Sequence, residues 1–325
     1  LAARADRRQR FGTNWSPKIG AKWAPHEKFM LRASAGEGYR PPSLYELRNP
    51  LMYTTTGRTA WPPSEPPFAP CTLEPGMDYC RIEFGTGINP GLRPEYSRQA
   101  TFGVVLAPSA AFNFSLDHYR IVRRNEYGVA DPIAYPGLFP NGLLRDPQGV
   151  LYRAELQLAN MAESKVCGWE LEANYSKPSK SGHFAARLGV SHLDRHLSSS
   201  LLKAEWTDIA GYESPKLTLK GNLQWRLEAY KATLNFRHFG RSFAYAAGEI
   251  CARQNEAAGK CMNPSTTLLD LNLAYSGIEG WTFSLSVNNL TDREPVNYRP
   301  GQDGYNIAID DPYGRYYLFS AAYRY

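Results

Sequence analysis

The sequence contains no long apolar run, and its mean hydropathy is −0.46. A membrane-spanning helix needs about 18 or more consecutive apolar residues, so a helical membrane protein is excluded. A membrane β-barrel is not excluded, because its strands alternate lipid-facing apolar residues with polar residues that face the lumen. The composition is therefore compatible with two classes of protein, a soluble protein and a membrane-spanning β-barrel.

Motifs of catalysis and of nucleic-acid binding are also missing. No HExxH, GxSxG or P-loop pattern occurs, and the six histidines are scattered. Ser191 and His192 are adjacent, and neighbouring residues of a strand point to opposite faces, so they do not form a catalytic pair. The chain carries 37 basic against 31 acidic residues, but no basic run exceeds two residues. We therefore predict no enzyme activity, no cofactor and no nucleic acid partner.

Cysteine is scarce, with five residues in 325. No two of them form a CxxC pair, which argues against a zinc site, and we predict no metal site. Cys71 with Cys80 and Cys251 with Cys261 are two close pairs, whereas Cys167 stands alone. The pairs predict two loop disulfides and an oxidising compartment, such as the periplasm or cell surface. Five unrelated free thiols are the alternative.

The sequence is rich in segments that alternate apolar and polar residues. The clearest is KLTLKGNLQWRL, residues 216–227, in which Leu219 and Lys220 are expected on opposite faces of one strand, like Asp270 and Leu271 further on. Such alternation predicts about eleven strands. Their ranges are 17–25, 27–37, 97–107, 111–122, 166–177, 183–195, 216–227, 231–237, 268–275, 281–288 and 316–325.

The expected connections alternate between short turns and long loops. Aromatic residues such as Trp23, Trp169 and Trp281 lie near strand ends, as in the interfacial belts of membrane proteins. These features predict an all-β, antiparallel transmembrane β-barrel with short periplasmic turns and long extracellular loops. A soluble β-sandwich or propeller is the alternative. The long loops are expected at 38–96, 123–165, 196–214, 242–266 and 291–315.

Four segments, taken in order, resemble the C-terminal half of TonB-dependent outer-membrane receptors. The first two are LRASAGEGYRPPSLYEL at 31–47 and NPGLRPEYSRQATFGVVL at 89–106. The other two are VNNLTDREPVNY at 287–298 and GRYYLFSAAYRY at 314–325. The resemblance implies a barrel of about 22 strands with an N-terminal plug in its lumen. Residues 1–325 would then be the C-terminal part of the barrel, with the plug and the first barrel half absent from this chain.

The resemblance also implies a function, namely TonB-energised active uptake of a scarce ligand, such as an iron chelate, cobalamin or an oligosaccharide. The implied location is the cell outer membrane of a Gram-negative bacterium. The implied partners are a TonB-type energy-transducing protein, the barrel assembly machinery, outer-membrane lipid and a small-molecule ligand. A passive diffusion porin is the main alternative, and a purely structural or adhesive barrel is another.

Tyrosine, tryptophan and arginine in the outer loops are the candidate ligand-binding residues. Aromatic rings stack on flat or sugar-like ligands, and arginine binds carboxylates and phosphates with two parallel hydrogen bonds. Packing of these loops on themselves is an equally weighted alternative. The resemblance further implies that the terminal Tyr325 is an assembly signal. The candidates are Tyr39, Arg40, Tyr45, Trp61, Trp206, Arg241, Tyr245, Tyr298 and Arg299.

Overall fold

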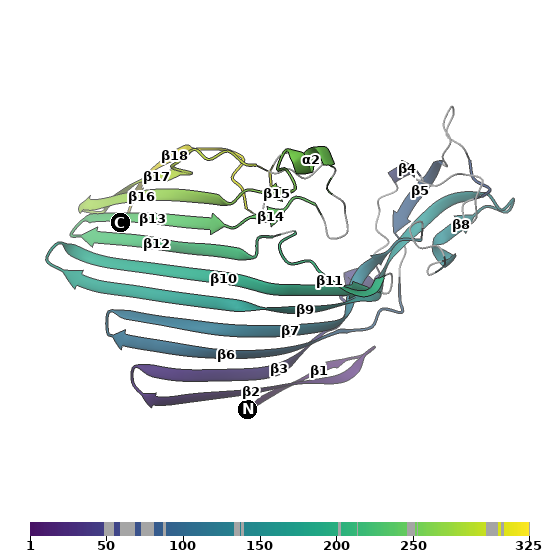
Figure 1. Cartoon of the computed structure of the whole chain (residues 1–325), viewed down its shortest axis with the longest axis horizontal. Coiled ribbons are helices and arrows are strands. Elements are labelled where there is room, and N and C mark those ends of the chain that lie inside the picture. Colours follow the sequence, from purple (N-terminus) through teal and green to yellow (C-terminus); the bar gives the residue numbers. More distant parts are fainter. Residues whose placement is uncertain are drawn as a thin grey trace.

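The computed structural model shows one curved antiparallel sheet with a small lobe beyond one end of its strands (Figure 1). Strands make up most of the described chain, and the helices α1 (Leu44–Arg48), α2 (Arg253–Ala257) and η1 (Pro140–Gly142) are short. None of the described helices is long and apolar enough to cross a membrane. The structure describes residues 1–48, 55–58, 69–72, 81–86, 89–132, 137, 140–200, 203–212, 214–245, 251, 253–296, 305–306 and 309–324.

Twelve strands form the main path of the sheet, each pairing antiparallel with the next. The all-β antiparallel fold predicted from the sequence is confirmed. In order, the strands are β1 (Ala2–Arg8), β2 (Gly12–His26), β3 (Phe29–Arg40), β6 (Glu95–Ser109), β7 (Phe112–Ala130), β9 (Leu151–Ser179), β10 (Gly182–Ser200), β12 (Leu217–Leu227), β13 (Tyr230–Phe239), β16 (Thr266–Ile278), β17 (Trp281–Asn288) and β18 (Tyr316–Tyr323).

The strand β1 was not expected from the sequence. Its residues, AARADRR, alternate alanine with charged side chains, so its apolar face is too weak to give a clear pattern. In the structure, β1 pairs with β2, and Ala5 lies opposite Trp15. The larger aromatic partner supplies the apolar surface that β1 itself lacks. The main path therefore has one strand more than the eleven predicted.

Strands also continue into segments expected to be loops. β7 extends to Ala130, and β9 begins at Leu151 and runs for 29 residues. The alternation of apolar and polar residues is absent from these segments, because both faces of a strand meet water beyond the membrane. Additional strands lie in the expected loops, namely β4 (Thr55–Arg58), β5 (Arg81–Thr86), β8 (Leu143–Arg145), β11 (Lys203–Asp208), β14 (Ser242–Phe243) and β15 (Met262–Asn263).

The lobe at the outer end of the sheet has its own small core. β5 pairs parallel with the first part of β9, and β8 pairs antiparallel with the same part. Ile82, Leu151 and Ala154 are buried between these strands, with Phe84 and Leu143 packed against them. The lobe is thus an ordered extension of the barrel wall, drawn at the upper right of Figure 1.

The strand register assigns side chains to two faces of the main sheet. One row joins Leu223, Leu234, Leu271, Val287 and Tyr317 across five strands. We call this the outward face, since apolar side chains meet lipid in a membrane barrel. The opposite, inward face carries Lys220 and Asp270, as predicted.

Ion pairs on the inward face link strands of the sheet, and the first of them reaches across β6. Arg32 of β3 donates to Asp117 of β7, and Arg237 of β13 lies 3.2 Å from Asp270 of β16. Among the described residues, β18 pairs only with β17, and the edge of β1 away from β2 is unpaired. The sheet is therefore open, as expected for part of a barrel.

Candidate functional site

The outer end of β3 and the short helix α1 that follows it carry three candidate ligand residues, Tyr39 and Arg40 on the strand and Tyr45 on the helix. Pro41 and Pro42 follow Arg40 and have no N–H group to donate, so the sheet pairing ends there. Ser43 then caps α1. Its hydroxyl accepts a hydrogen bond from the Glu46 N–H at 3.2 Å, and the Glu46 carboxylate accepts one from the Ser43 N–H at 2.7 Å. This reciprocal pair is a capping box, and it holds Glu46 facing back toward the strand.

Arg40 joins three elements at this end of the sheet. Its Nη1 donates to Glu95 Oε2 at 2.8 Å, and its Nη2 donates to Glu46 Oε1. The guanidinium also lies 5.0 Å from the centre of the Tyr127 ring. Glu95 in turn accepts the Tyr127 N–H at 2.8 Å. We call Arg40, Glu46, Glu95 and Tyr127 the Arg40 cluster; it ties α1 to β6 and β7.

The charges of the Arg40 cluster are balanced by one another. The carboxylates of Glu95 and Glu46 raise the pKa of Arg40, against the effect of burial. Burial alone would raise the pKa of Glu46, but the Ser43 and Arg40 hydrogen bonds outweigh it and lower the pKa. Burial, with the nearby negative charges, raises the pKa of Tyr127. Two carboxylates neutralise the guanidinium, so Arg40 positions α1 and is not a free anion site.

A pocket of about 550 Å³ adjoins the Arg40 cluster. Tyr39 and Tyr96 line it with ring centres 5.7 Å apart. The hydroxyl groups of Tyr39 and Tyr127 are buried and have no hydrogen-bond partner among the described residues. Charges of both signs also line it, from Arg40, Arg123, Glu95 and Glu126. The pocket suits a ligand that presents both aromatic surface and hydrogen-bonding groups.

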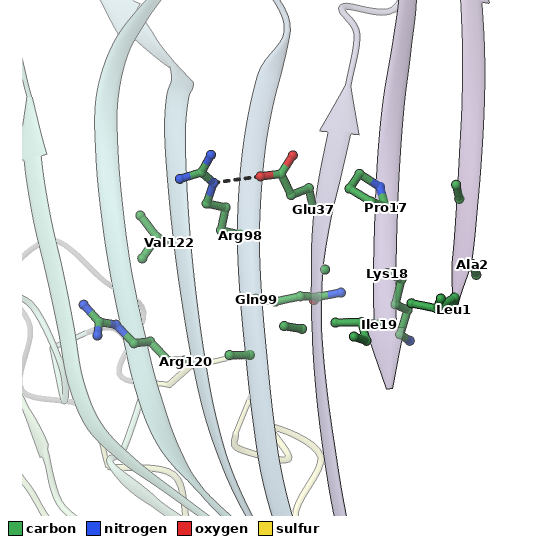
Figure 2. A pocket seen from close by; sticks show the side chains of 14 residues that line it. Leu1, Ala2, Pro17, Lys18, Ile19, Glu37, Arg98, Gln99, Arg120 and Val122 are labelled. Atoms are coloured by element: carbon green, nitrogen blue, oxygen red, sulfur yellow. Dashed lines mark hydrogen bonds and ion pairs between the residues drawn. The ribbon is translucent and has the colours of Figure 1, made fainter. Parts of the chain in front are cut away.

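A second hollow lies on the outward face, across β1, β2, β3, β6 and β7 (Figure 2). Its volume is about 790 Å³, and small or aliphatic side chains such as Ala35, Ala100 and Ile19 line it. Arg98 and Arg120 stand at one side, and Arg98 Nε donates to Glu37 at 2.9 Å. No candidate ligand residue lines this hollow.

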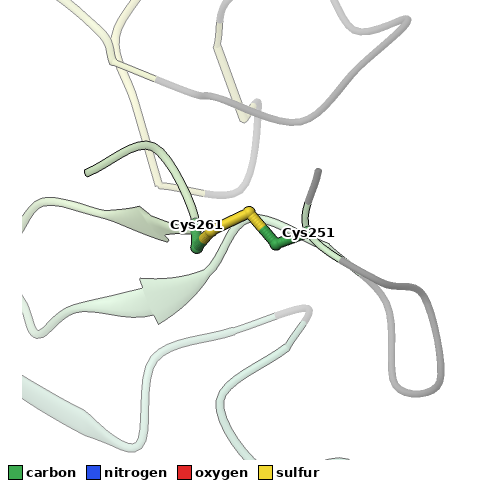
Figure 3. The surroundings of a disulfide bond; sticks show 2 residues. All are labelled: Cys251 and Cys261. Carbon is green, nitrogen blue, oxygen red and sulfur yellow. A yellow bond between two sulfur atoms is a disulfide. The ribbon is translucent and has the colours of Figure 1, made fainter. Parts of the chain in front are cut away.

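The loop between β13 and β16 is closed by a disulfide between Cys251 and Cys261, the pair expected from the sequence (Figure 3). Their Cα atoms are 5.8 Å apart. The short strands β14 and β15 pair beside this disulfide, and the Phe243 ring stacks on Tyr212 with centres 4.4 Å apart. This arrangement holds two candidates near the loop base, Arg241, which is exposed, and Tyr245, which is half-buried.

The remaining cysteines are Cys71, Cys80 and Cys167. Cys71 is disulfide-bonded, and Cys80, its expected partner, lies outside the described residues. Cys167 is a free thiol in the middle of β9. It lies two residues from Trp169, so both side chains are on the outward face.

The nine candidates do not form one site in the described structure. Tyr39 and Arg40 are adjacent at the end of β3, and Tyr45 projects from α1 with 61% of its surface exposed. Trp206 instead packs under the Lys165 ammonium, 3.6 Å from its ring centre, on the wall of the sheet. Three candidates, Trp61, Tyr298 and Arg299, lie outside the described residues, and so does Tyr325.

Sequence reasoning missed the two glutamates that hold Arg40 in place. Glu46 could have been found, because Ser43 and Glu46 have the spacing of a capping box. Glu95 gives no such signal, since it is 55 residues from Arg40 and only the strand register brings them together.

Comparisons with known proteins agree with this architecture. The family described as TonB dependent receptor-like, beta-barrel matches residues 1–290. The siderophore receptor PirA from Acinetobacter baumannii is similar in structure, with a TM-score of 0.65 and 17% identity over 99% of this chain. A mutant of the ferric enterobactin receptor PfeA from Pseudomonas aeruginosa, in complex with enterobactin, has a TM-score of 0.64 and 18% identity over 98% of this chain.

The copper transporter OprC is also similar, with a TM-score of 0.56 and 15% identity over 96% of this chain. The chain covers 42% of PirA, 42% of PfeA and 39% of OprC, so it spans less than half the length of these proteins. No curated protein matches it. The family match covers most of the chain, and the open antiparallel sheet agrees with it. The chain belongs to the TonB-dependent receptor-like β-barrel family and is a protein of the Gram-negative outer membrane.

Proposed function

We propose that this chain is the C-terminal part of a receptor for TonB-energised uptake of a scarce ligand, and that this ligand is a metal chelate. The family match over residues 1–290 carries the proposal. Of the similar structures, one is named as a siderophore receptor, one as a ferric enterobactin receptor and one as a copper transporter, which favours a metal chelate over cobalamin or an oligosaccharide. The plug and the first barrel half, outside this chain, would supply the contact with the TonB-type protein.

The pocket beside the Arg40 cluster is the proposed outer part of the ligand path. It combines tyrosine rings with charges of both signs, which suits a chelate that carries aromatic and polar groups. In this proposal Tyr39 and Tyr45 contact the ligand, and Arg40 positions α1. Further contacts are proposed for the candidates in the other loops, Trp61, Trp206, Arg241, Tyr245, Tyr298 and Arg299.

Uptake by the full-length protein tests the function. Cells that express it would be given iron chelates labelled with radioactive iron, with and without a functional TonB-type protein. We expect accumulation only when the TonB-type protein is present. Equal accumulation in both strains, together with rapid entry of small sugars, would instead show a passive diffusion porin. No ligand-dependent accumulation of any kind would indicate a structural or adhesive barrel.

A paired substitution tests the roles at the pocket. Tyr45→Ala should weaken chelate binding without changing the order of α1, because the Tyr45 side chain is exposed. Arg40→Lys should loosen α1, since lysine cannot reach both carboxylates with a planar pair of donors. Hydrogen exchange of α1 separates the two, and equal exchange in both variants would contradict the assignment.

We also propose that Tyr325 is part of the signal read by the barrel assembly machinery. An amphipathic ring at the end of the last strand would lie at the periplasmic interface, where aromatic side chains are favoured. Deleting Tyr325 should lower the amount of receptor in the outer membrane and leave the ligand affinity of the assembled molecules unchanged. Normal surface abundance of this deletion would disprove the assignment.

A further inference from the structure

The segment NPGLRP, residues 89–94, lies between β5 of the lobe and β6 along the chain, and Glu95 of the Arg40 cluster follows it directly. We call residues 89–94 the strap. Leu92 is only 2% exposed, so the strap packs against the protein. The strap also turns on itself, because the Asn89 side chain accepts the N–H of Gly91 at 2.8 Å and the Asn89 carbonyl accepts the N–H of Leu92 at 3.3 Å. The strap is therefore a folded part of the wall.

Asn160 of β9 binds the strap and β7 at the same time. Its Oδ1 accepts a hydrogen bond from the Arg93 N–H at 2.8 Å, and its Nδ2 donates to the Arg93 carbonyl at 2.7 Å. The same Nδ2 also donates to the Asn125 carbonyl of β7 at 2.8 Å. An asparagine amide has two N–H donors and one carbonyl acceptor, so each group of the Asn160 amide is used. One side chain thus joins three segments that are far apart in the sequence.

Asn160 lies beside a β-bulge in β7. The register between β7 and β9 shifts between Arg123 and Glu126, and again between Glu126 and Tyr127. Asn125, within the bulge, has a φ of 58°, in the left-handed region that few residues other than glycine adopt. Bulges re-aim side chains next to functional sites, and both Glu126 and Tyr127 line the pocket beside the Arg40 cluster. The bulge therefore sets the direction of two pocket side chains.

The bulge is held on both sides by groups that belong to the strap, follow it or bind it. Asn160 binds the carbonyl of Asn125, and Glu95 accepts the N–H of Tyr127 at 2.8 Å. The Tyr127 hydroxyl is buried and has no hydrogen-bond partner among the described residues, so no bond of its own fixes where it points. Its position depends on the backbone that carries it, and Asn160 holds that backbone.

The bonds of Asn160 contribute more to position than to stability. Arg93 is exposed, so water can replace the bonds to its backbone when the amide is lost. The backbone pairing of β7 with β9 extends from Phe112 to Ala130 and does not depend on the Asn160 side chain. A side chain that contacts a ligand needs surrounding residues to hold its direction to within about 0.5 Å. Loss of the Asn160 amide should therefore disturb the pocket and leave the barrel wall intact.

We propose that Asn160 is the positioning residue of the ligand pocket. Asn160 does not line the pocket; it fixes the bulge of β7 against the strap, and so fixes the direction of the Glu126 and Tyr127 side chains. The inference rests on the proposed function, because it takes the pocket beside the Arg40 cluster as a ligand site. Side chains that are held in place in advance lose less conformational freedom on binding, and the complex then dissociates more slowly.

Hydrogen exchange of the full-length receptor tests the positioning without a ligand. The variant Asn160→Asp keeps the size of the side chain but loses both donated bonds, and it places a negative charge beside two carbonyl oxygens. Peptides that cover residues 89–94 and 124–128 should exchange about tenfold faster, the effect of about one lost hydrogen bond. Unchanged exchange of these peptides would overturn the proposal.

The matched control is Asn174→Asp, the same change near the other end of β9. There the amide donates to Asn113 at 3.3 Å, and neither residue lines the pocket. This control should leave the exchange of residues 89–94 and 124–128 as in the wild type. Faster exchange of these peptides in the control as well would show a general loosening of β9 and overturn the specific role of Asn160.

Chelate binding tests the consequence for the ligand. The probes are ferric enterobactin, a ferric tris-hydroxamate and ferric citrate, and the variants are compared on the one that the wild type binds most tightly. Asn160→Asp should release this chelate about tenfold faster and bind it at a similar rate, whereas Asn174→Asp should behave like the wild type. The midpoint of heat-induced unfolding should be the same in both variants. A lower midpoint in Asn160→Asp alone would show a role in stability and overturn the proposal.

Two substitutions at Asn125 test the bulge independently. Asn125→Gly and Asn125→Val both keep the carbonyl that Asn160 binds, and both lose the contact of the Asn125 side chain with Pro94 at 3.5 Å. Glycine adopts the left-handed φ without cost, whereas a β-branched residue strongly disfavours it. Asn125→Val should therefore release the chelate several-fold faster than Asn125→Gly does. Equal release rates in the two variants would overturn the proposal.

Failure of this inference and failure of the proposed function give different results. If Asn160→Asp loosens the bulge but releases the chelate at the wild-type rate, Asn160 does not position the pocket, and chelate uptake stands. If the wild type binds none of the three chelates, the proposed function is wrong, and the ligand role of Asn160 is wrong with it.

Discussion

The outward face differs sharply between two parts of the sheet. On β12, β13, β16, β17 and β18 the described outward residues are apolar or uncharged, mainly leucine, phenylalanine, tyrosine and tryptophan. On β6 to β10 the same face changes from apolar to basic beyond His118 and Trp169. The second group of strands is longer, up to 29 residues in β9 against 13 in β16. The outward face is therefore uncharged on the shorter strands and becomes basic where the longer strands extend further.

Adding the same charge to the two regions should give the largest difference. Leu271→Arg places a cation among lipid tails, at a cost of about 2 to 4 kcal/mol, and should strongly lower the yield of assembled barrel. Val122→Arg places it between Arg98 and Lys165, beyond the aromatic row, where the cost is about 0 to 1 kcal/mol. Heat-modifiable migration of the full-length protein in gels measures the yield. Lys220→Ser, on the inward face, is the control, and equal yields of both arginine variants would show that the faces are assigned wrongly.

The loops at the outer ends of the strands are held by different bonds, and removal of the disulfide should affect only one of them. The disulfide closes the loop over β13 and β16, whereas ion pairs hold α1 over β3 and β6. Replacing Cys251 and Cys261 by serine should loosen this loop by about 3 kcal/mol and speed proteolysis after Lys260. The Arg40 cluster should keep its hydrogen-exchange protection in that variant. Loss of protection in both loops would mean that they are coupled.

The inward ion pairs of the two regions have similar exposure but should differ in strength. The Asp270 carboxylate accepts hydrogen bonds from the Arg237 side chain and from the backbone N–H of Asn289, a residue only 1% exposed. The Asp117 carboxylate accepts hydrogen bonds from the side chain of Arg32. Asp270→Ala leaves a buried N–H unpaired and should lower the free energy of unfolding by about 1 to 3 kcal/mol. Asp117→Ala should lower it less, as measured by the midpoint of heat-induced unfolding, and the reverse order would contradict the role of Asn289.

The smallest expected effect concerns the pH dependence of α1. The folded pKa of Glu46 is lowered, so the helix is most stable above the unfolded pKa of a glutamate, about 4.3. This stability is lost as the pH falls through the lowered folded pKa. Glu46→Gln should remove this dependence and weaken the helix by about 1 kcal/mol at neutral pH. Hydrogen exchange of residues 44–48 between pH 3 and 7 measures it, and an unchanged profile in the variant would exclude Glu46.

Much of the fold could be predicted because membrane strands obey a period of two. The ranges expected for β12, β13 and β17 end within two residues of those observed, since their two faces meet lipid and water. The last strand, β18, pairs antiparallel with β17, its neighbour in the sequence. The ends of β7 and β9 could not be predicted, because water surrounds both faces there. The small core of Ile82, Leu151 and Ala154 joins residues about 70 positions apart, a distance that no local pattern reveals.

The sequence by itself determined which residues alternate, where the short turns lie and which family the chain resembles, because these depend on neighbours along the chain. Only the tertiary structure decided that Arg40 meets Glu95, that Trp206 packs on Lys165, and that Asn160 binds Arg93. The physical reason is the register between strands. A shift of one residue in any pairing would move each side chain to the opposite face, and the register follows from the whole sheet.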